Sequence, residues 1–523
     1  MSIPDFIKSL WSEKRFHWLA AGLGVIVATW GVWNTHGVIN KDGTLYIRAA
    51  SFFADGKWTQ GIDLYNWPFY SLVLAAGHNL TGLPFQTVGH VLAILFFALS
   101  SAAFVMILRE AGGRRDVMSA GLLVFLASPC LVGDIVPMIV REHGFWAFLL
   151  WSLWSLMRFY NTNRFVYALA WGVSVSMAAL FRIEGLAFLV FLPSALFFQA
   201  RHAWQVKMGM FARAHSVLLV GSILLAGIFL INPLLKPDDL GRLFEPFNII
   251  VKVFSEGDQI LKEKAQIYGT LVLGEWLEEH ALPGLLLTLA WALLFKIVGT
   301  AGLGQTLLLT ASLEKRRIFK ELSAFPVLLV FLLIGFANCV FILLNNFLIA
   351  DRMTSPVAFA VQVFAAFMLA GLYRSFTDPA KKTARIGFLI VISLLAGQLV
   401  KTLLPADSGD SYEVKAVRWM NANKKQHERV FYDTMRLRYY AGEFQNDQNL
   451  DWPGVKQLFD SGSIEKQHYL VVHGPEKYPE QVAYIQERLG DPIMQFHNGR
   501  KNRVLVYRVC HPGECKQTGE SVH

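Results

Sequence analysis

Long apolar stretches run through the first 404 residues and leave little material for a water-soluble fold. A transmembrane helix needs roughly 20 mostly apolar residues, and the sequence offers about eleven candidates. They lie at about 17–35, 86–108, 117–133, 143–157, 165–181, 185–200, 216–232, 281–298, 324–345, 353–373 and 386–404. Charged residues make up only 17% of the chain, against about 25% in soluble domains. The pattern predicts an α-helical polytopic membrane protein and excludes a soluble enzyme, a disordered scaffold and a disulfide-rich secreted domain.

A change in charge density near residue 405 divides the chain. Of the 48 Lys and Arg residues and the 39 Asp and Glu residues, 16 of each lie in residues 405–523. This segment is therefore densely charged but neutral, and residues 1–404 carry the whole net charge of +9. We expect a membrane domain over 1–404 and a separate small domain over 405–523.

The C-terminal segment has the pattern of a small α/β domain. Helical periods fall at about 411–424, 451–460 and 477–489, and strand patterns at about 429–433, 468–473 and 503–509. No glycine-rich phosphate-binding fingerprint follows these strands, so a docking or lid domain is expected rather than a nucleotide site. Cys510 and Cys515 flank a short loop, where a disulfide is favoured over a zinc site if the domain is extracytoplasmic.

Basic residues gather in alternate loops of the membrane domain, at 1–16, 109–116, 158–164, 201–215, 296–321 and 374–385. Because positive loops stay in the cytoplasm, this places the N-terminus inside and the C-terminal domain outside. The same rule explains the positive net charge without a nucleic-acid partner. The long loops 36–85 and 233–280 then lie outside, where an extracytoplasmic site would be built.

Two of the candidate chemical groups lie in early outer segments. In the first, Asp42 follows the first span and is trailed by Tyr46 and Arg48 at or near helical spacing. A partly desolvated carboxylate at the bilayer surface suits a general base, although Asp42 could equally cap a helix. The second group gathers Asp134, Arg141, Glu142 and His143 between two apolar runs. Arg141 could bind a phosphate, or an Arg–Glu pair could cap the next helix, and His143 fits a hydrogen-bonded structural role.

Two further acid–base pairs lie deeper in the sequence. Arg182 and Glu184 interrupt a long apolar stretch, and Asp351 and Arg352 precede the tenth span. Ionisable residues within membrane segments mark functional sites by default. The alternatives are a salt bridge between two short spans and an interfacial arginine that snorkels. All four groups fall on the predicted outer face, which favours one site for an anionic, lipid-linked substrate.

Four motifs together resemble the GT-C superfamily of polytopic, polyprenyl-phosphate-sugar-dependent glycosyltransferases, in its bacterial branch related to protein O-mannosyltransferases and aminoarabinose transferases. They are KDGTLYIRAA, which holds Asp42, YNWPFY, VREHGFW and DRMTSP, which holds Arg352. The resemblance covers most of residues 1–404. It implies a site in the bacterial inner membrane that faces the periplasm.

The resemblance also implies roles for individual residues. Asp42 would be the general base of inverting sugar transfer, and Arg352, with Arg141 or Arg182, would stabilise the departing lipid phosphate. The remaining residues expected to bind the lipid phosphate or the substrate are His143, Glu184, Tyr46 and Arg48. The donor would be a monosaccharide on a polyprenyl phosphate, most simply undecaprenyl phosphate, and the acceptor a glycan, a lipid or a protein.

The sequence departs from the family pattern in two respects. Gly43 follows Asp42 where the family often has a second acid, so that acid would come from Asp134 or Glu142. The chain lacks a WWDYG-type motif, so no cofactor is assigned and a divalent metal has no motif to support it. The main rival function is a flippase or transporter of lipid-linked sugars, and a saccharide polymerase is a close cousin. Against a transporter, the chain has no clear internal repeat and its charges lie at one face.

Overall fold

The computed structural model describes residues 13–231, 245–311, 322–377, 382–404, 411–444, 451–474, 478–498 and 502–509. The chain divides into two compact units. Unit 1 comprises Met1–Asn34, Asn66–Val73 and Thr87–Leu404, and unit 2 comprises Thr35–Tyr65, Leu74–Gln86 and Pro405–His523. Unit 2 thus combines most of the first long loop with the C-terminal segment.

Unit 1 is entirely helical in its described residues. Its elements are α2 (Phe16–Trp33), α6 (Phe85–Glu110), α7 (Arg115–Leu126), η1 (Pro129–Ile135), α8 (Glu142–Thr162), α9 (Phe165–Phe181), α10 (Gly185–Phe191), η2 (Leu192–Phe198), α11 (Trp204–Ala214), α12 (Ser216–Ile231), α13 (Glu245–Tyr268), η4 (Gly269–Leu273), η5 (Glu275–His280), α14 (Ala281–Ala301), α15 (Leu303–Ala311), α17 (Phe325–Asn346), η6 (Asp351–Thr354), α18 (Ser355–Phe376) and α19 (Lys382–Leu403). Helix α5 (Phe69–Thr81) begins directly after Pro68 and is shared between the units.

The chain is a multi-pass membrane protein, and its described residues contain fewer long spans than the eleven candidates of the sequence. Among the described residues, six helices are long and apolar enough to cross a membrane, or seven if the bent pair α7 and η1 counts as one span. They are Phe16–Trp33, Phe85–Glu110, Trp276–Ala301, Phe325–Asn346, Asp351–Phe376 and Lys382–Leu403. Several apolar runs are too short, because α9 has 17 residues and Pro193 starts a new helical segment, η2, after α10.

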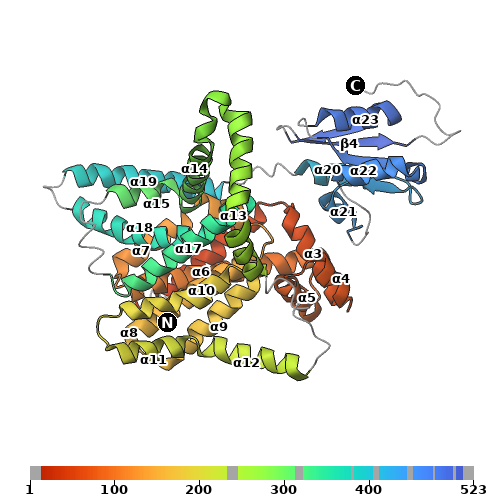
Figure 1. The fold of residues 1–523 in the computed structure, drawn as a ribbon. Helices are drawn as coiled ribbons and strands as arrows, with labels where there is room; N and C mark the ends of the chain where they lie inside the picture. Colours follow the sequence, from red (N-terminus) through yellow and green to blue (C-terminus); the bar gives the residue numbers. More distant parts are fainter. Residues whose placement is uncertain are drawn as a thin grey trace, which may run out of the picture. The chain divides into compact units, whose positions relative to one another are not determined.

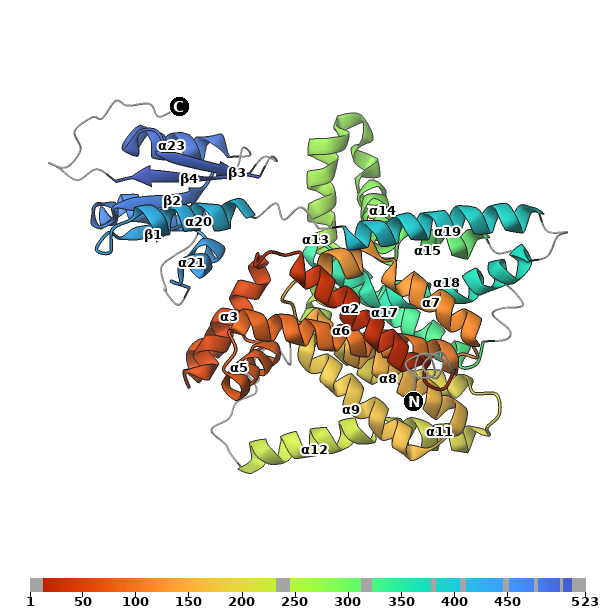
Figure 2. The ribbon, with the colours of Figure 1, turned by 180° about the vertical axis from the view of Figure 1, so that it is seen from behind.

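Antiparallel neighbours make up most of unit 1. Helices α8 and α9 form a hairpin, and α18 lies against α7 (Figure 1). Helix α2 lies beside α7 and α19 on the opposite face (Figure 2). Stacked rings fill the centre, where Phe125 lies between Phe97 and Phe104 of α6. A β-carbon on Gly121 of α7 would lie 3.1 Å from that of Ala366 in α18, so glycine permits this close helix approach.

Polar contacts identify the two ends of this bundle. At one end, Glu110 of α6 accepts hydrogen bonds from Arg158 at 3.0 Å and from Asn161 at 2.7 Å, both in α8. Ser323 precedes α17 and donates to Asn161 at 3.0 Å, so α17 begins at this end. A helix of 22 residues is about 33 Å long, so α17 ends and α18 begins at the other end.

Lys296 lies at the end of the bundle where α18 begins. The charge count had placed residues 296–321 among the basic loops at the opposite end, and for Lys296 this prediction was wrong. Its ammonium group is 3.0 Å from Asp351 Oδ1. One turn later, Thr300 donates to the Asp351 carbonyl at 3.1 Å. The charge count treated Lys296 as a loop residue, whereas it belongs to α14. Residues 312–321 of that segment lie outside the described residues.

Unit 2 contains a four-stranded sheet in the order β1-β2-β4-β3. The strands are β1 (Val430–Tyr432), β2 (Tyr469–His473), β3 (Met494–His497) and β4 (Arg503–Arg508). Strands β1 and β2 are parallel, and β4 is antiparallel to both β2 and β3. The helices are α20 (Ser411–Asn423), α21 (Met435–Ala441), α22 (Asp451–Asp460), η7 (Ser463–Lys466) and α23 (Pro479–Leu489). The predicted helices and strands of the C-terminal segment are confirmed, while α21 and β3 were not predicted.

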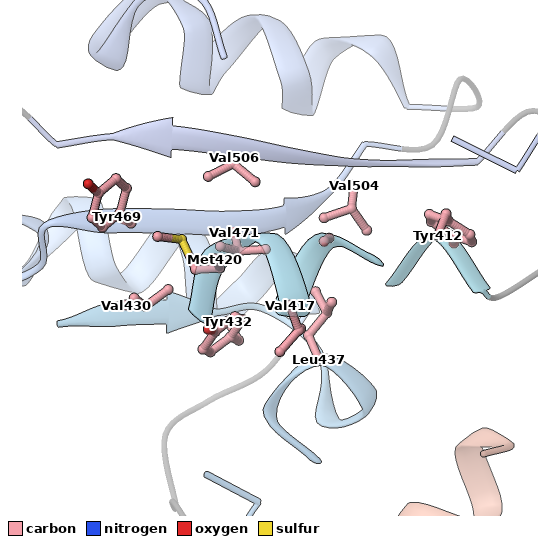
Figure 3. Close-up of a cluster of buried hydrophobic side chains, with 11 residues drawn as sticks. Tyr412, Val417, Met420, Val430, Tyr432, Leu437, Tyr469, Val471, Val504 and Val506 are labelled. Atoms are coloured by element: carbon pink, nitrogen blue, oxygen red, sulfur yellow. The ribbon is translucent and has the colours of Figure 1, made fainter. Parts of the chain in front are cut away.

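The alternation of strand side chains separates two cores. Helices α20 and α21 cover one face, whose buried side chains are Tyr412, Ala416, Val417, Met420, Val430, Tyr432, Leu437, Tyr469, Val471, Val504 and Val506 (Figure 3). Helices α22 and α23 cover the other face, with Phe431, Val455, Leu458, Leu470, Val472, Val482, Ile485, Leu505, Tyr507 and Val509. Residues i and i+2 of each strand thus share a face, as a pleated strand requires.

The first long loop contributes two helices to unit 2, α3 (Lys41–Ala54) and α4 (Trp58–Leu64). Helix α3 contacts α21. The backbone N–H of Ile39 donates to Tyr440 Oη at 3.0 Å, and Tyr439 Oη donates to Gln86 at 3.0 Å. These hydrogen bonds tie both ends of the loop to the C-terminal segment.

Candidate functional site

Glu142 is the centre of a buried cluster of charged side chains in unit 1. It lies in the first turn of α8, and its side chain is 1% exposed. Its Oε1 accepts a hydrogen bond from Arg182 Nη1, and Arg352 Nε lies 3.3 Å from the same oxygen. A buried charge in a membrane protein is costly unless it is paired. Two guanidinium groups on one carboxylate provide that pairing.

Arg182 is enclosed by carboxylates at the break between α9 and α10. It is the extended residue that ends α9, with φ −142° and ψ 128°. Its Nε donates to Glu184 Oε2 at 3.2 Å, and its Nη2 donates to Glu184 Oε1. The guanidinium also lies over the ring of Phe145, and the side chain is only 3% exposed. The turn needs glycine, because a β-carbon on Gly185 would lie 2.7 Å from the backbone of Ala179.

Arg352 belongs to the same cluster but retains exposed surface. It lies in η6, the single 3-10 turn that precedes α18, and its side chain is 29% exposed. Its neighbour Asp351 instead pairs with Lys296 of α14. Arg141 is half-buried at the start of α8 and interacts electrostatically with Glu142 and Glu184. Three arginines therefore face two glutamates.

Neutral polar side chains anchor the helices around this cluster. Trp146 Nε1 of α8 donates to Ser355 Oγ of α18 at 2.7 Å. Asn338 of α17 donates to the Glu184 carbonyl at 3.3 Å. Tyr70 of α5 is buried and interacts electrostatically with Glu142. Trp146, Ser355 and Tyr70 lie in the VREHGFW, DRMTSP and YNWPFY motifs, although the sequence assigned them no role. Asn338 lies in none of these motifs, and the signal that could have found it is an isolated Asn within an apolar span.

The other candidates of the VREHGFW segment are placed differently. His143 is buried, with Nε2 2.9 Å from the Met138 carbonyl and its ring edge-on to Trp146. This is the hydrogen-bonded structural arrangement expected for His143. Asp134 is exposed in the π-helical turn η1 and interacts electrostatically with Lys401 and Asp351. Of the two candidate second acids, only Glu142 therefore lies against Arg182 and Arg352.

Asp42 belongs to unit 2, in the first turn of α3. The residue at the N-cap is Asn40, so Asp42 is not the cap that the alternative interpretation expected. Asp42 is half-buried and lies one turn before Tyr46, whose ring packs edge-on against Tyr65 at 5.3 Å. A carboxylate in a first helical turn also interacts favourably with the helix dipole.

Arg48 packs on the same helix as Asp42. It is buried, and its guanidinium lies over the ring of Phe52 at 5.7 Å. It also interacts electrostatically with Arg438 of α21.

A second charged cluster, which the sequence did not predict, lies in unit 2 at the carboxyl ends of β1 and β2. Glu413, fully buried in the first turn of α20, is 2.8 Å from His473 Nε2 and 2.6 Å from Arg436 Nη2. Asp433 Oδ2 accepts a hydrogen bond from the His473 backbone N–H at 2.8 Å. Tyr412 Oη lies 3.0 Å from His473 Nε2. Burial alone would lower the pKa of His473, but the carboxylates of Asp433 and Glu413 raise the pKa to about 10.

No group of three or more His, Cys, Asp or Glu side chains suited to a metal ion occurs among the described residues. Cys130 and Cys339 are free thiols, and Cys339 donates to the Met353 carbonyl at 3.6 Å. The predicted disulfide between Cys510 and Cys515 falls outside the described part of the chain.

Comparison with solved structures identifies the fold. No family model matches the sequence, and no curated protein matches it. The structure is similar to ArnT from Cupriavidus metallidurans bound to undecaprenyl phosphate, with a TM-score of 0.54 and 12% identity over 94% of this chain and 97% of ArnT. It is also similar to the archaeal oligosaccharyltransferase AglB from Archaeoglobus fulgidus in complex with an inhibitory peptide and a dolichol-phosphate. Here the TM-score is 0.51, with 12% identity over 90% of this chain and 71% of AglB. The chain therefore has a GT-C-like fold, as the four sequence motifs implied.

Proposed function

We propose that this protein is a membrane glycosyltransferase that moves a monosaccharide from a polyprenyl phosphate to an extracytoplasmic acceptor, with inversion at the anomeric carbon. The observation that carries the proposal is the cluster in which Arg182 and Arg352 share the buried Glu142. Both similar structures hold a polyprenyl phosphate, and undecaprenyl phosphate is the lipid bound to ArnT. We place the protein in a bacterial inner membrane, with a cytoplasmic N-terminus and residues 405–523 in the periplasm.

Binding of the donor phosphate is assigned to the partly exposed arginines of the cluster, Arg352 first. Arg352 is 29% exposed in a chain that spans a membrane, so its guanidinium can meet a lipid headgroup. Arginine offers five N–H donors in a planar fork that matches phosphate oxygens. The negative charge on the phosphate grows as the sugar departs, and fixed donors aimed at that charge stabilise the transition state.

The base role is assigned to Asp42, on its position in the KDGTLYIRAA motif and in the half-buried first turn of α3. The acceptor hydroxyl oxygen attacks the anomeric carbon, and the bond from that carbon to the phosphate oxygen breaks with its electron pair. The acceptor proton passes to the Asp42 carboxylate, and the polyprenyl phosphate leaves as the dianion. A glycan, a lipid or a protein hydroxyl can each serve as the acceptor in this scheme.

The test is a transfer assay with purified protein in lipid nanodiscs. The donors are undecaprenyl-phosphate-linked hexoses and pentoses, the acceptor is a total cell-envelope extract, and released undecaprenyl phosphate is quantified. We expect transfer by the wild type and a loss of about 10²–10⁴-fold in Asp42→Asn, because the amide cannot accept a proton.

Asp63→Asn is the matched control, since Asp63 is an exposed acid of the neighbouring helix α4. It should transfer at the wild-type rate. Near-wild-type transfer by Asp42→Asn would remove Asp42 from the base role. Donor that crosses the bilayer intact, with no glycosidic bond formed by the wild type, would identify a flippase instead.

A further inference from the structure

We infer that Glu142 is a positioning residue that holds Arg352 toward the donor phosphate, and that it is not the second acid of the reaction. The inference rests on the proposed function, since it takes Arg352 as a phosphate ligand. It goes further by assigning different tasks to residues that the sequence grouped together. Arg182 and Glu184 become the buried support of the carboxylate, and Arg352 becomes its working partner.

The first argument is access. A general acid or base must come within about 2.6–3.2 Å of the proton it transfers. The Glu142 side chain is 1% exposed, its Oε1 is already engaged by Arg182 and Arg352, and its Oε2 is buried. A carboxylate clamped by two cations is stabilised in its charged form and is therefore a poor proton acceptor.

The second argument is the contrast between the two arginines. Arg182 spends Nε and Nη2 on Glu184 and Nη1 on Glu142, and its side chain is 3% exposed. It has almost no surface to offer a lipid headgroup. Arg352 has its Nε 3.3 Å from the same glutamate oxygen, and its side chain is 29% exposed. The shared oxygen of Glu142 therefore holds Arg352 at its Nε atom, and the exposed part of the Arg352 side chain stays accessible.

The third argument is the charge of the cluster. Arg141, Arg182 and Arg352 supply three positive charges against the two negative charges of Glu142 and Glu184. The single positive excess matches the single negative charge of a sugar phosphodiester. It remains in place when the departing phosphate gains its second charge, so the cluster favours the later stages of bond cleavage. Glu142 thus limits the excess to one charge as well as orienting Arg352.

A double-mutant cycle tests the assignment in purified protein with a donor that the wild type uses. Arg352→Ala should lower kcat about 10²–10³-fold, as loss of a transition-state donor does. Glu142→Gln should lower kcat about 10–10²-fold, because a displaced Arg352 is a mispositioned group. In the Arg352→Ala background, Glu142→Gln should cause almost no further loss, and the pH–rate profile of Glu142→Gln should keep the wild-type shape.

Losses that multiply in the double variant, or a limb missing from the pH–rate profile of Glu142→Gln, would show a direct role and overturn the inference. Glu110→Gln is the matched control, because Glu110 is another buried carboxylate paired with an arginine, at the opposite end of the bundle. It should lower Tm and leave kcat unchanged. If Glu142→Gln does not fold, Glu142→Asp keeps the charge and shortens the side chain, and the same cycle applies. If the wild type transfers sugar and Arg352→Ala transfers it at the same rate, both the phosphate role of Arg352 and this inference are refuted. Absence of any transfer by the wild type would refute the proposed function itself.

Discussion

The two units each contain a glutamate buried among cations, and the balance of charge differs between them. In unit 1, Glu142 and Glu184 face three arginines. In unit 2, Glu413 and Asp433 face Arg436 and His473, and Arg438 interacts electrostatically with Asp433 and Glu443, so three negative charges meet three positive ones. The unit 1 cluster has one positive charge to offer an anion, whereas the unit 2 cluster is neutral. The comparison separates a cluster suited to binding from one suited to holding its own domain together.

The largest expected effect is the loss of stability when the unit 2 cluster is broken by substitution of Glu413. Glu413→Gln leaves Arg436 and His473 without their shared carboxylate, and loss of one partner of a buried pair costs about 3–5 kcal/mol. Hydrogen exchange of the β2 amides in the full-length protein should report this loss as faster exchange, with unit 1 unchanged. Unaltered protection of β2 would mean that the cluster does not stabilise unit 2.

The next effect distinguishes the arginines of the two clusters. Arg352→Ala should weaken undecaprenyl-phosphate binding as well as turnover, with a loss of at least about 10²-fold, or about 2.7 kcal/mol, in kcat/KM. Arg436→Ala should leave both quantities at the wild-type level in folded protein, because its charge is spent on Glu413. Binding by titration calorimetry in nanodiscs checks this, and equal losses in both variants would erase the distinction.

A smaller effect is the pH dependence of unit 2. The folded-state pKa of His473 is raised to about 10, above its ordinary 6.5, so the charged imidazole stabilises the fold. This stabilisation is complete below about pH 6.5 and is lost as the pH rises toward 10. The protection factors of the β2 amides should therefore fall between these values. His473→Gln should flatten the dependence, and a wild type whose protection rises over this range would contradict the charge assignment.

The smallest effect concerns a neutral support of the unit 1 cluster. Trp146→Phe removes the hydrogen bond to Ser355 while keeping an aromatic ring, and should lower the free energy of unfolding by about 1 kcal/mol. Ser355→Ala should cost a similar amount, and the double variant little more than either. Thermal unfolding in detergent measures the three. Fully additive losses would show that the two side chains act independently.

The sequence predicted the local features of both units and failed where distant segments meet. Apolar runs and strand periods are local, so the six long spans and three of the C-terminal strands could be located. Charge at the ends of apolar runs also pointed to Glu142, Arg182 and Arg352, because charge is rare there. Their convergence on one oxygen depends on how α8, α9 and η6 pack against one another, which no local pattern encodes.

The missed features have the same physical origin. Glu413 and His473 are ordinary residues for a water-exposed domain, so nothing in composition marks them until the parallel strands bring their ends together. Lys296 was misplaced because counting basic residues by loop ignores cations that remain within a helix. The GT-C resemblance supplied the fold expectation, which comparison with solved structures then supported.

The adjacency of Asp351 and Arg352 has a consequence for how this sequence can change over time. Asp351 pairs with Lys296 and Arg352 pairs with Glu142, although Asp351 and Arg352 are adjacent in the chain. Among relatives, position 351 should covary with position 296, because an exchange of the two charges preserves that half-exposed pair. Position 352 should instead stay arginine whichever residue occupies position 351. Exchanging its charge with that of the buried Glu142 would leave the other charges of the cluster without opposite partners. Relatives should therefore show a covarying position 351 directly beside an invariant position 352, both within this single 3-10 turn.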